Sequence, residues 1–159
     1  MNTDRTPPEQ IPIEDLLPHR APMLLLTGLL SASPTQLRAS ATVPESGLFE
    51  LPLQPGCVSA AAFGLECMAQ AIAAWDGYFC CVTQQPIRTG LILGARDFHS
   101  AHATFAAGTY LQISADLVMQ TDEGIGVFDC TINAGAVMQT ARLTVLTVSD
   151  LEEVRNLAR

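Results

Sequence analysis

The segment from Cys57 to Cys81 constrains the fold more strongly than any other part of the chain. It contains no proline, is rich in alanine, and would place apolar residues around almost the whole circumference of a helix. A run of this length exceeds a typical strand and predicts a helix. Because a helix that is apolar on nearly all sides is buried, other elements must cover most of its surface.

Glu66 is the one charged residue in the stretch FGLECMAQAIAAW, which runs from Phe63 to Trp75. An unpaired carboxylate among apolar side chains carries a large free-energy cost. Glu66 is therefore either a structural carboxylate bonded to backbone at a subunit interface or part of a functional site, and we favour the site. Gln70 lies four residues later on the same helical face, where its amide can hold the carboxylate in one rotamer.

The remaining segments predict strands, with short helices near both ends. A helical turn at 13–18 precedes strands at 23–31 and 36–43; after the long helix, strands follow at 91–98, 109–119, 126–132 and 136–148, and a capped helix occupies 149–159. Residues 1–12 are polar and proline-rich and predict a flexible arm. We predict one α+β domain over 13–159 with the hotdog layout, an antiparallel sheet wrapped around one long central helix and completed by a second subunit.

Charge and cysteine content exclude several classes of protein. The net charge is −8, which argues against nonspecific binding to nucleic acid or to an anionic membrane. The polar start lacks the features of a secretory signal, and no apolar stretch reaches membrane-spanning length. The five cysteines show no CxxC pairing and no metal-ligand spacing with histidine. They predict buried free thiols in a cytoplasmic protein without a metal site.

Two motifs resemble those of a known family. LLPHRAPMLLLTGLL and, later, GLECMAQAIAAW resemble the N-terminal and helix motifs of the 3-hydroxyacyl-carrier-protein dehydratases, in the same order and at a matching separation. The later strands also fit that family, so the resemblance covers about 13–148. The similarity is greatest to a divergent branch found in aryl polyene and related fatty-acid-like clusters.

The resemblance implies an enzyme that dehydrates 3-hydroxyacyl thioesters, and it implies Glu66 as a catalytic residue. The family's usual histidine, in Gly-His-Phe-Pro-Gly, would fall at Pro52, so that residue is missing here. The divergent branch also lacks it and retains the histidine of Pro-His-Arg, which is His19 in this chain. His19 is therefore our candidate for the general base. The alternative is a structural histidine that anchors the N-terminal turn.

Further expectations concern the substrate. It would be a thioester on the phosphopantetheine arm of an acyl carrier protein or on CoA, and no other cofactor is implied. Backbone N–H groups at the start of the helix, from Gly56 to Ser59, would polarise the thioester carbonyl. Arg20, Arg88 and Arg96 are candidates for contacting the phosphate of the arm or an acidic carrier.

His99 and His102 lie three apart near the end of a strand, which would point them to opposite faces, and they predict solvated loop histidines. One alternative function is a hotdog acyl thioesterase. The other is a catalytically weak subunit that pairs with another hotdog dehydratase. The chain is expected to form a homodimer or a heterodimer with such a subunit.

Overall fold

The computed structural model describes residues 6–149, and the predicted C-terminal helix lies almost entirely outside them. The elements are a 3-10 turn at Pro8–Gln10, α1 (Ile13–Leu16), β1 (Leu26–Ala32), β2 (Gln36–Thr42), β3 (Glu50–Leu51), β4 (Gln54–Ser59), α2 (Ala60–Val82), β5 (Thr89–Ser100), β6 (Thr104–Ala106), β7 (Tyr110–Gln120), β8 (Ile125–Asn133) and β9 (Val137–Val148). Among these residues, no helix has the length and apolar character needed to cross a membrane.

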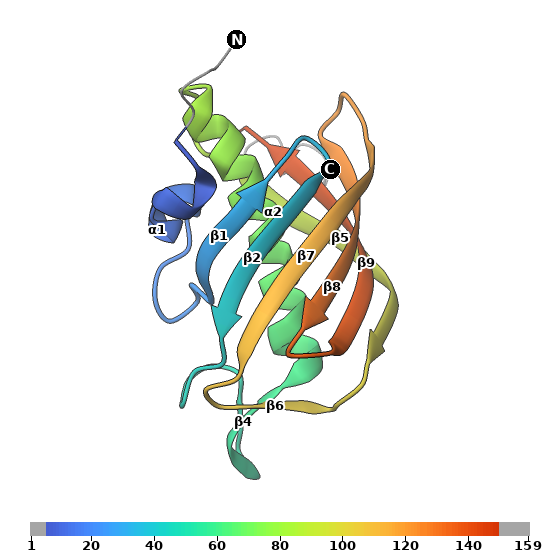
Figure 1. Ribbon diagram of the computed structural model, residues 1–159. Coiled ribbons are helices and arrows are strands. Elements are labelled where there is room, and N and C mark those ends of the chain that lie inside the picture. Colours follow the sequence, from blue (N-terminus) through green and yellow to red (C-terminus); the bar gives the residue numbers. More distant parts are fainter. Residues whose placement is uncertain (1–5, 150–159) are drawn as a thin grey trace, which may run out of the picture.

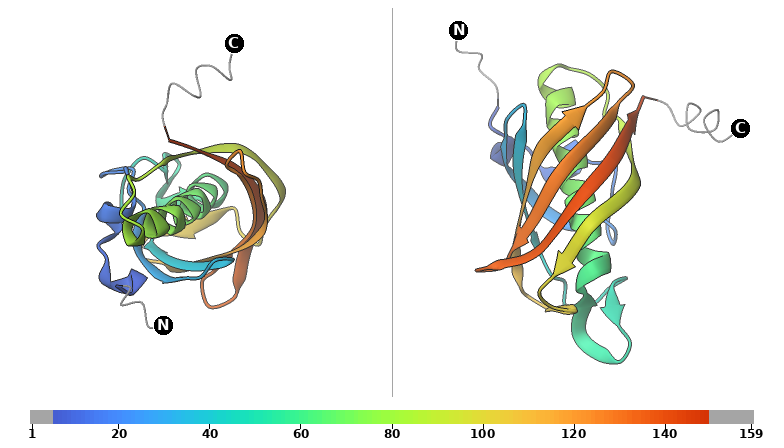
Figure 2. Two further views of the ribbon diagram at one scale, coloured as in Figure 1. Left: turned by 90° about the horizontal axis from the view of Figure 1, so that it is seen from above. Right: turned by 90° about the vertical axis from the view of Figure 1, so that its right-hand side faces the viewer.

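The main sheet is antiparallel, has the strand order β1-β2-β7-β8-β9-β5, and curls around α2 (Figure 1). Viewed from above, the helix lies inside the curve of the sheet (Figure 2). A smaller sheet, in the order β3-β4-β6, lies near the start of α2. The predicted α+β arrangement, one long helix enclosed by an antiparallel sheet, is confirmed.

The core lies between α2 and the concave face of the sheet. Large side chains of the helix, such as Phe63 and Met68, are fully buried against inward residues of the strands, such as Ile113 and Leu143. Cys67, Cys80 and Cys130 are buried free thiols, as predicted, whereas the other two cysteines are only half-buried. Burial raises the pKa of the Cys130 thiol to about 12, so this group packs in the core as a neutral side chain.

The helix begins later than predicted. Residues 54–59 form β4, which pairs with β3 and β6, and the helix starts at Ala60. The Ser59 hydroxyl caps it by accepting from the Ala62 N–H at 3.4 Å. Gly56 is therefore a strand residue with a φ of +74°, a conformation that suits glycine. The expectation that the helix starts near Gly56 is wrong, because pairing with distant strands overrides the local helical pattern.

The described part of the N-terminal arm packs against the domain. Residues 8–10 form the 3-10 turn, and the Tyr78 hydroxyl of α2 donates to the Thr6 carbonyl at 3.3 Å. The chain then passes through α1, which lies beside α2, and leads to the segment that contains His19 (Figure 1).

Candidate active site

A cavity of about 260 Å³ lies between α2 and the inner faces of β5, β8 and β9. Small residues create it. On the helix, Ala69 and Ala73 face the cavity, and on the sheet Gly90 and Gly126 do so. No atom lies within 4 Å of the place where a Cβ of Gly90 would be. Because these positions carry no bulky side chain, the space between the sheet and the helix is left unfilled there.

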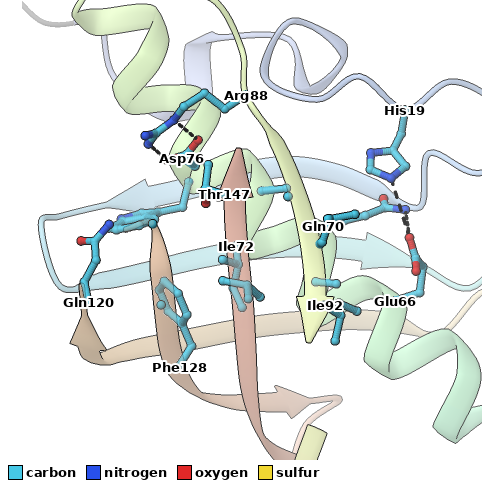
Figure 3. Close-up of a pocket in the computed structure, with 18 residues that line it drawn as sticks. His19, Glu66, Gln70, Ile72, Asp76, Arg88, Ile92, Gln120, Phe128 and Thr147 are labelled. Carbon is cyan, nitrogen blue, oxygen red and sulfur yellow. Dashed lines mark hydrogen bonds and ion pairs between the residues drawn. The ribbon is translucent and has the colours of Figure 1, made fainter. Parts of the chain in front are cut away.

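The middle of the cavity is apolar, and its two ends are polar (Figure 3). Ile72 of the helix and Ile92 of β5 lie in the middle, and Phe128 of β8 lies toward the side that holds Gln120. Phe128 packs edge-to-face against Trp75, with ring centroids 5.5 Å apart. The arrangement suits an elongated apolar ligand whose reacting group lies at one end.

Glu66 lies at one end of the cavity, and its side chain is 25% exposed. The carboxylate is held by Gln70, whose Nε2 donates to Glu66 Oε1 at 2.8 Å. Gln70 itself is 1% exposed and bonds to backbone on the N-terminal segment. The predicted Glu66–Gln70 contact is thus confirmed, and the carboxylate opens onto the cavity instead of being sealed among main-chain donors.

His19 faces Glu66 across the same end of the cavity, with Nε2 at 3.9 Å from Oε1 (Figure 3). This separation is longer than a hydrogen bond. The other ring nitrogen, Nδ1, is buried and has no hydrogen-bond partner among the described residues. The ring therefore presents Nε2 to the carboxylate and to the space beside it.

Arg20 organises the turn that presents His19. Its Nη1 donates to the Leu17 carbonyl at 2.9 Å and to the His19 carbonyl at 2.7 Å. The side chain does not line the cavity. Arg20 thus stabilises the backbone that carries the imidazole, and its predicted contact with substrate stays a prediction.

The opposite end of the cavity holds an ion pair that the sequence did not predict. Arg88, in the connection after α2, donates through Nε to Asp76 Oδ2 at 3.1 Å and through Nη2 to Asp76 Oδ1. The hydrogen bonds that Arg88 donates to Asp76 raise the pKa of the guanidinium. The sequence could have identified Asp76 as a site residue, because it is the second charged residue on an otherwise apolar helix. Its partner Arg88 could not be identified in this way, because it lies in the loop after the helix.

The other predicted site residues lie elsewhere. Gly56 and Ser59 do not line the cavity, and both backbone N–H groups are already used: Gly56 N–H donates to Glu50 Oε1 at 3.1 Å and Ser59 N–H to the Phe49 carbonyl at 3.3 Å. Their predicted role toward the thioester carbonyl stays a prediction. His99 and His102 are exposed and lie away from Glu66, near the start of α2.

Comparison with solved structures gives a strong match. The dehydratase heterocomplex ApeI:P from Xenorhabdus doucetiae matches with a TM-score of 0.83 and 28% identity, over 94% of this chain and 99% of that chain. A hypothetical thioesterase with coenzyme A from Streptococcus pneumoniae matches at 13% identity and a TM-score of 0.57, over 77% of this chain and 85% of that chain. The Escherichia coli PaaI protein matches at 15% identity and a TM-score of 0.53, over 74% of this chain and 80% of that chain. The last two matches show the hotdog fold alone.

No sequence among the curated proteins matches the chain. A family model does: residues 11–156 match that of the ApeP-like family, described as ApeP dehydratase. This match confirms the predicted resemblance to a divergent branch of the hotdog dehydratases, and the fold and length agree with it. The chain therefore belongs to the ApeP-like family of hotdog-fold dehydratases.

Proposed function

We propose that this protein dehydrates 3-hydroxyacyl groups held as thioesters, using Glu66 and His19. The observation that supports the proposal most directly is the pairing of these two side chains at the end of an apolar cavity, with 3.9 Å between Nε2 and Oε1. An acid and a base at this separation can reach two neighbouring carbons of one substrate. The apolar middle of the cavity would hold the acyl chain.

The reaction breaks the C2–H and C3–O bonds and forms a C2=C3 double bond. His19 Nε2 takes the proton from C2, and the electron pair of that bond forms the double bond. Glu66, in its protonated form, gives its proton to the departing hydroxyl, which leaves as water. The proton on His19 then returns to Glu66, and both groups are restored. The products are an enoyl thioester and one water molecule.

The pairing of Glu66 with His19 would replace the usual histidine of the wider family. Pro52 occupies the sequence position where that histidine is expected. Pro52 lies in the turn between β3 and β4 of the smaller sheet, and it does not line the cavity. His19, on the segment between α1 and β1, faces Glu66 instead, with 3.9 Å between Nε2 and Oε1.

The proposal includes a carrier and a partner subunit. The thioester would be held on the phosphopantetheine arm of an acyl carrier protein in an aryl polyene pathway, or on CoA. The matched relative from Xenorhabdus doucetiae is a dehydratase heterocomplex. By analogy, we propose that this chain pairs with a second hotdog subunit, with a homodimer as the alternative outcome.

The test is the activity of Glu66→Gln and His19→Asn, assayed in complex with a second hotdog subunit whose own active site has been inactivated. Glu66→Gln removes the acid and keeps the shape of the side chain, so kcat for the hydration of enoyl thioesters should fall by about 100-fold or more. His19→Asn should cause a similar loss. Glu45→Gln, an exposed glutamate outside the cavity, is the matched control.

Three outcomes would contradict the proposal. If Glu66→Gln keeps the wild-type rate, the carboxylate is structural. If the wild-type complex releases a free acid, the protein is a thioesterase. If the wild-type chain adds no activity to the inactivated partner, it is a catalytically weak subunit that shapes the assembly.

A further inference from the structure

We infer that the Asp76–Arg88 ion pair is the end wall of the acyl cavity and limits the length of chain that the protein accepts. The inference rests on the proposed function, because it assigns the far end of the same cavity. It follows from the placement of the pair, its contacts, and the space around Gly90.

The ion pair lies at the opposite end of the cavity from Glu66 and His19, with the apolar middle between them (Figure 3). Ten residues of helix separate Glu66 from Asp76, which corresponds to about 15 Å along the axis. An extended chain advances about 3.5 Å for every three bonds, so this distance accommodates roughly a dozen carbon atoms.

The contacts make the pair a barrier between the cavity and solvent. The Asp76 side chain is 14% exposed and accepts from two nitrogens of Arg88, whose own side chain is 40% exposed. One face of the pair thus lines the cavity and the other meets water. An apolar chain that extends past this point must separate two charges that bond in a fixed, two-point geometry. A chain that ends before the pair leaves it intact.

Gly90 lies two residues after Arg88, at the start of β5. It lies opposite Thr147 in the β5–β9 register, and both residues line the cavity. Its backbone conformation is ordinary for a strand, and no atom lies within 4 Å of a Cβ built there. Because Ile92, two residues along the strand, and Thr147, the register partner, both line the cavity, a side chain at position 90 would lie on the cavity side and shorten it.

Two variants that change the wall in opposite directions test the inference. Arg88→Ala removes the partner of Asp76 and opens the end of the cavity, whereas Gly90→Leu fills the space before it. The wild-type and variant complexes are assayed with 3-hydroxyoctanoyl, 3-hydroxydodecanoyl and 3-hydroxyoctadecanoyl pantetheine thioesters. The measured quantity is the ratio of kcat/KM for the longest substrate to that for the shortest.

We expect Arg88→Ala to raise this ratio by about tenfold or more, and Gly90→Leu to lower it. The matched control is Arg142→Ala, which removes an arginine from a similar two-point pair with Asp129 that does not line the cavity. Its ratio should equal that of the wild type. Unfolding curves of all variants show whether each is folded.

The outcomes separate this inference from the proposed function. If the wild-type complex converts none of the thioesters, both fail. If it converts them but Arg88→Ala and Gly90→Leu leave the ratio unchanged, the dehydratase function stands and the end wall is disproved. A change of the same size in Arg142→Ala would also overturn the inference.

Discussion

Gln70 links the active-site carboxylate to the N-terminal segment. Its Nε2 donates to the Met23 carbonyl at 2.6 Å as well as to Glu66, and its Oε1 accepts from the Leu25 N–H at 3.0 Å. Both amide protons are therefore used inside the protein. Gln70 acts as a positioning residue, because it has no donor left for a substrate.

Replacing Gln70 with leucine should destabilise the protein by about 2–4 kcal/mol, because the Met23 carbonyl and the Leu25 N–H lose their buried partner. Urea denaturation of the variant measures this loss. Gln112→Leu, on the exposed face of β7, is the control and should cost much less. If both variants lose the same free energy of unfolding, the three hydrogen bonds of Gln70 contribute no more to stability than an exposed glutamine does.

At the residue scale, the sequence predicted the part of the site that lies on one helix. Glu66 and Gln70 are four residues apart, and helical geometry alone brings them together. The approach of His19 to Glu66 depends on how the N-terminal segment crosses the helix, and no local pattern specifies that path. The contact between Asp76 and Arg88 depends on the loop after α2 in the same way.

At the scale of elements, α2 was predicted well because its apolar composition is a local property of the chain. β4 was missed because its proline- and glycine-rich sequence gives no strand signal. Its strand conformation depends on pairing of Cys57 with Ala106 and of Val58 with Phe105, partners that are far away in the sequence. Strands β7 and β8, which alternate apolar and polar residues, were predicted close to their observed bounds.

The packing of α1 on α2 requires a glycine. A Cβ on Gly77 would lie 2.1 Å from the Leu16 carbonyl oxygen. Because this neighbour is backbone, it can move only if α1 moves as a unit. The stretch from Leu17 to Arg20 directly follows α1 and contains His19. A displaced α1 therefore also displaces the imidazole.

Gly77→Ala should therefore lower both stability and activity. We expect a loss of about 1–3 kcal/mol in the free energy of unfolding, together with a reduced kcat for hydration of enoyl thioesters. Gly94→Ala on β5 is the matched control, because no atom lies within 4 Å of its Cβ position. Wild-type stability and kcat in Gly77→Ala would show that α1 and α2 are not in close contact.

At the scale of the whole molecule, the two edges of the main sheet differ. The N-terminal segment lies beside β1, so that edge is covered (Figure 1). At the other edge, β5 pairs only with β9 among the described residues. Ile92 and Leu93 of β5 are large apolar residues with 47% and 55% of their surfaces exposed. A long strand edge with exposed apolar side chains is a surface on which another chain can add strands.

The proposed pairing with a second hotdog subunit should therefore depend on the β5 edge. Leu93→Lys places a charge on this edge and should abolish assembly, as measured by light scattering after size-exclusion chromatography. Val118→Lys is the control, because Val118 is also exposed but lies on β7, in the interior of the sheet order. Because Gly90 and Ile92 of β5 also line the cavity, loss of assembly should reduce activity as well. An assembly that Leu93→Lys leaves intact would mean that the subunits meet through another surface than the β5 edge.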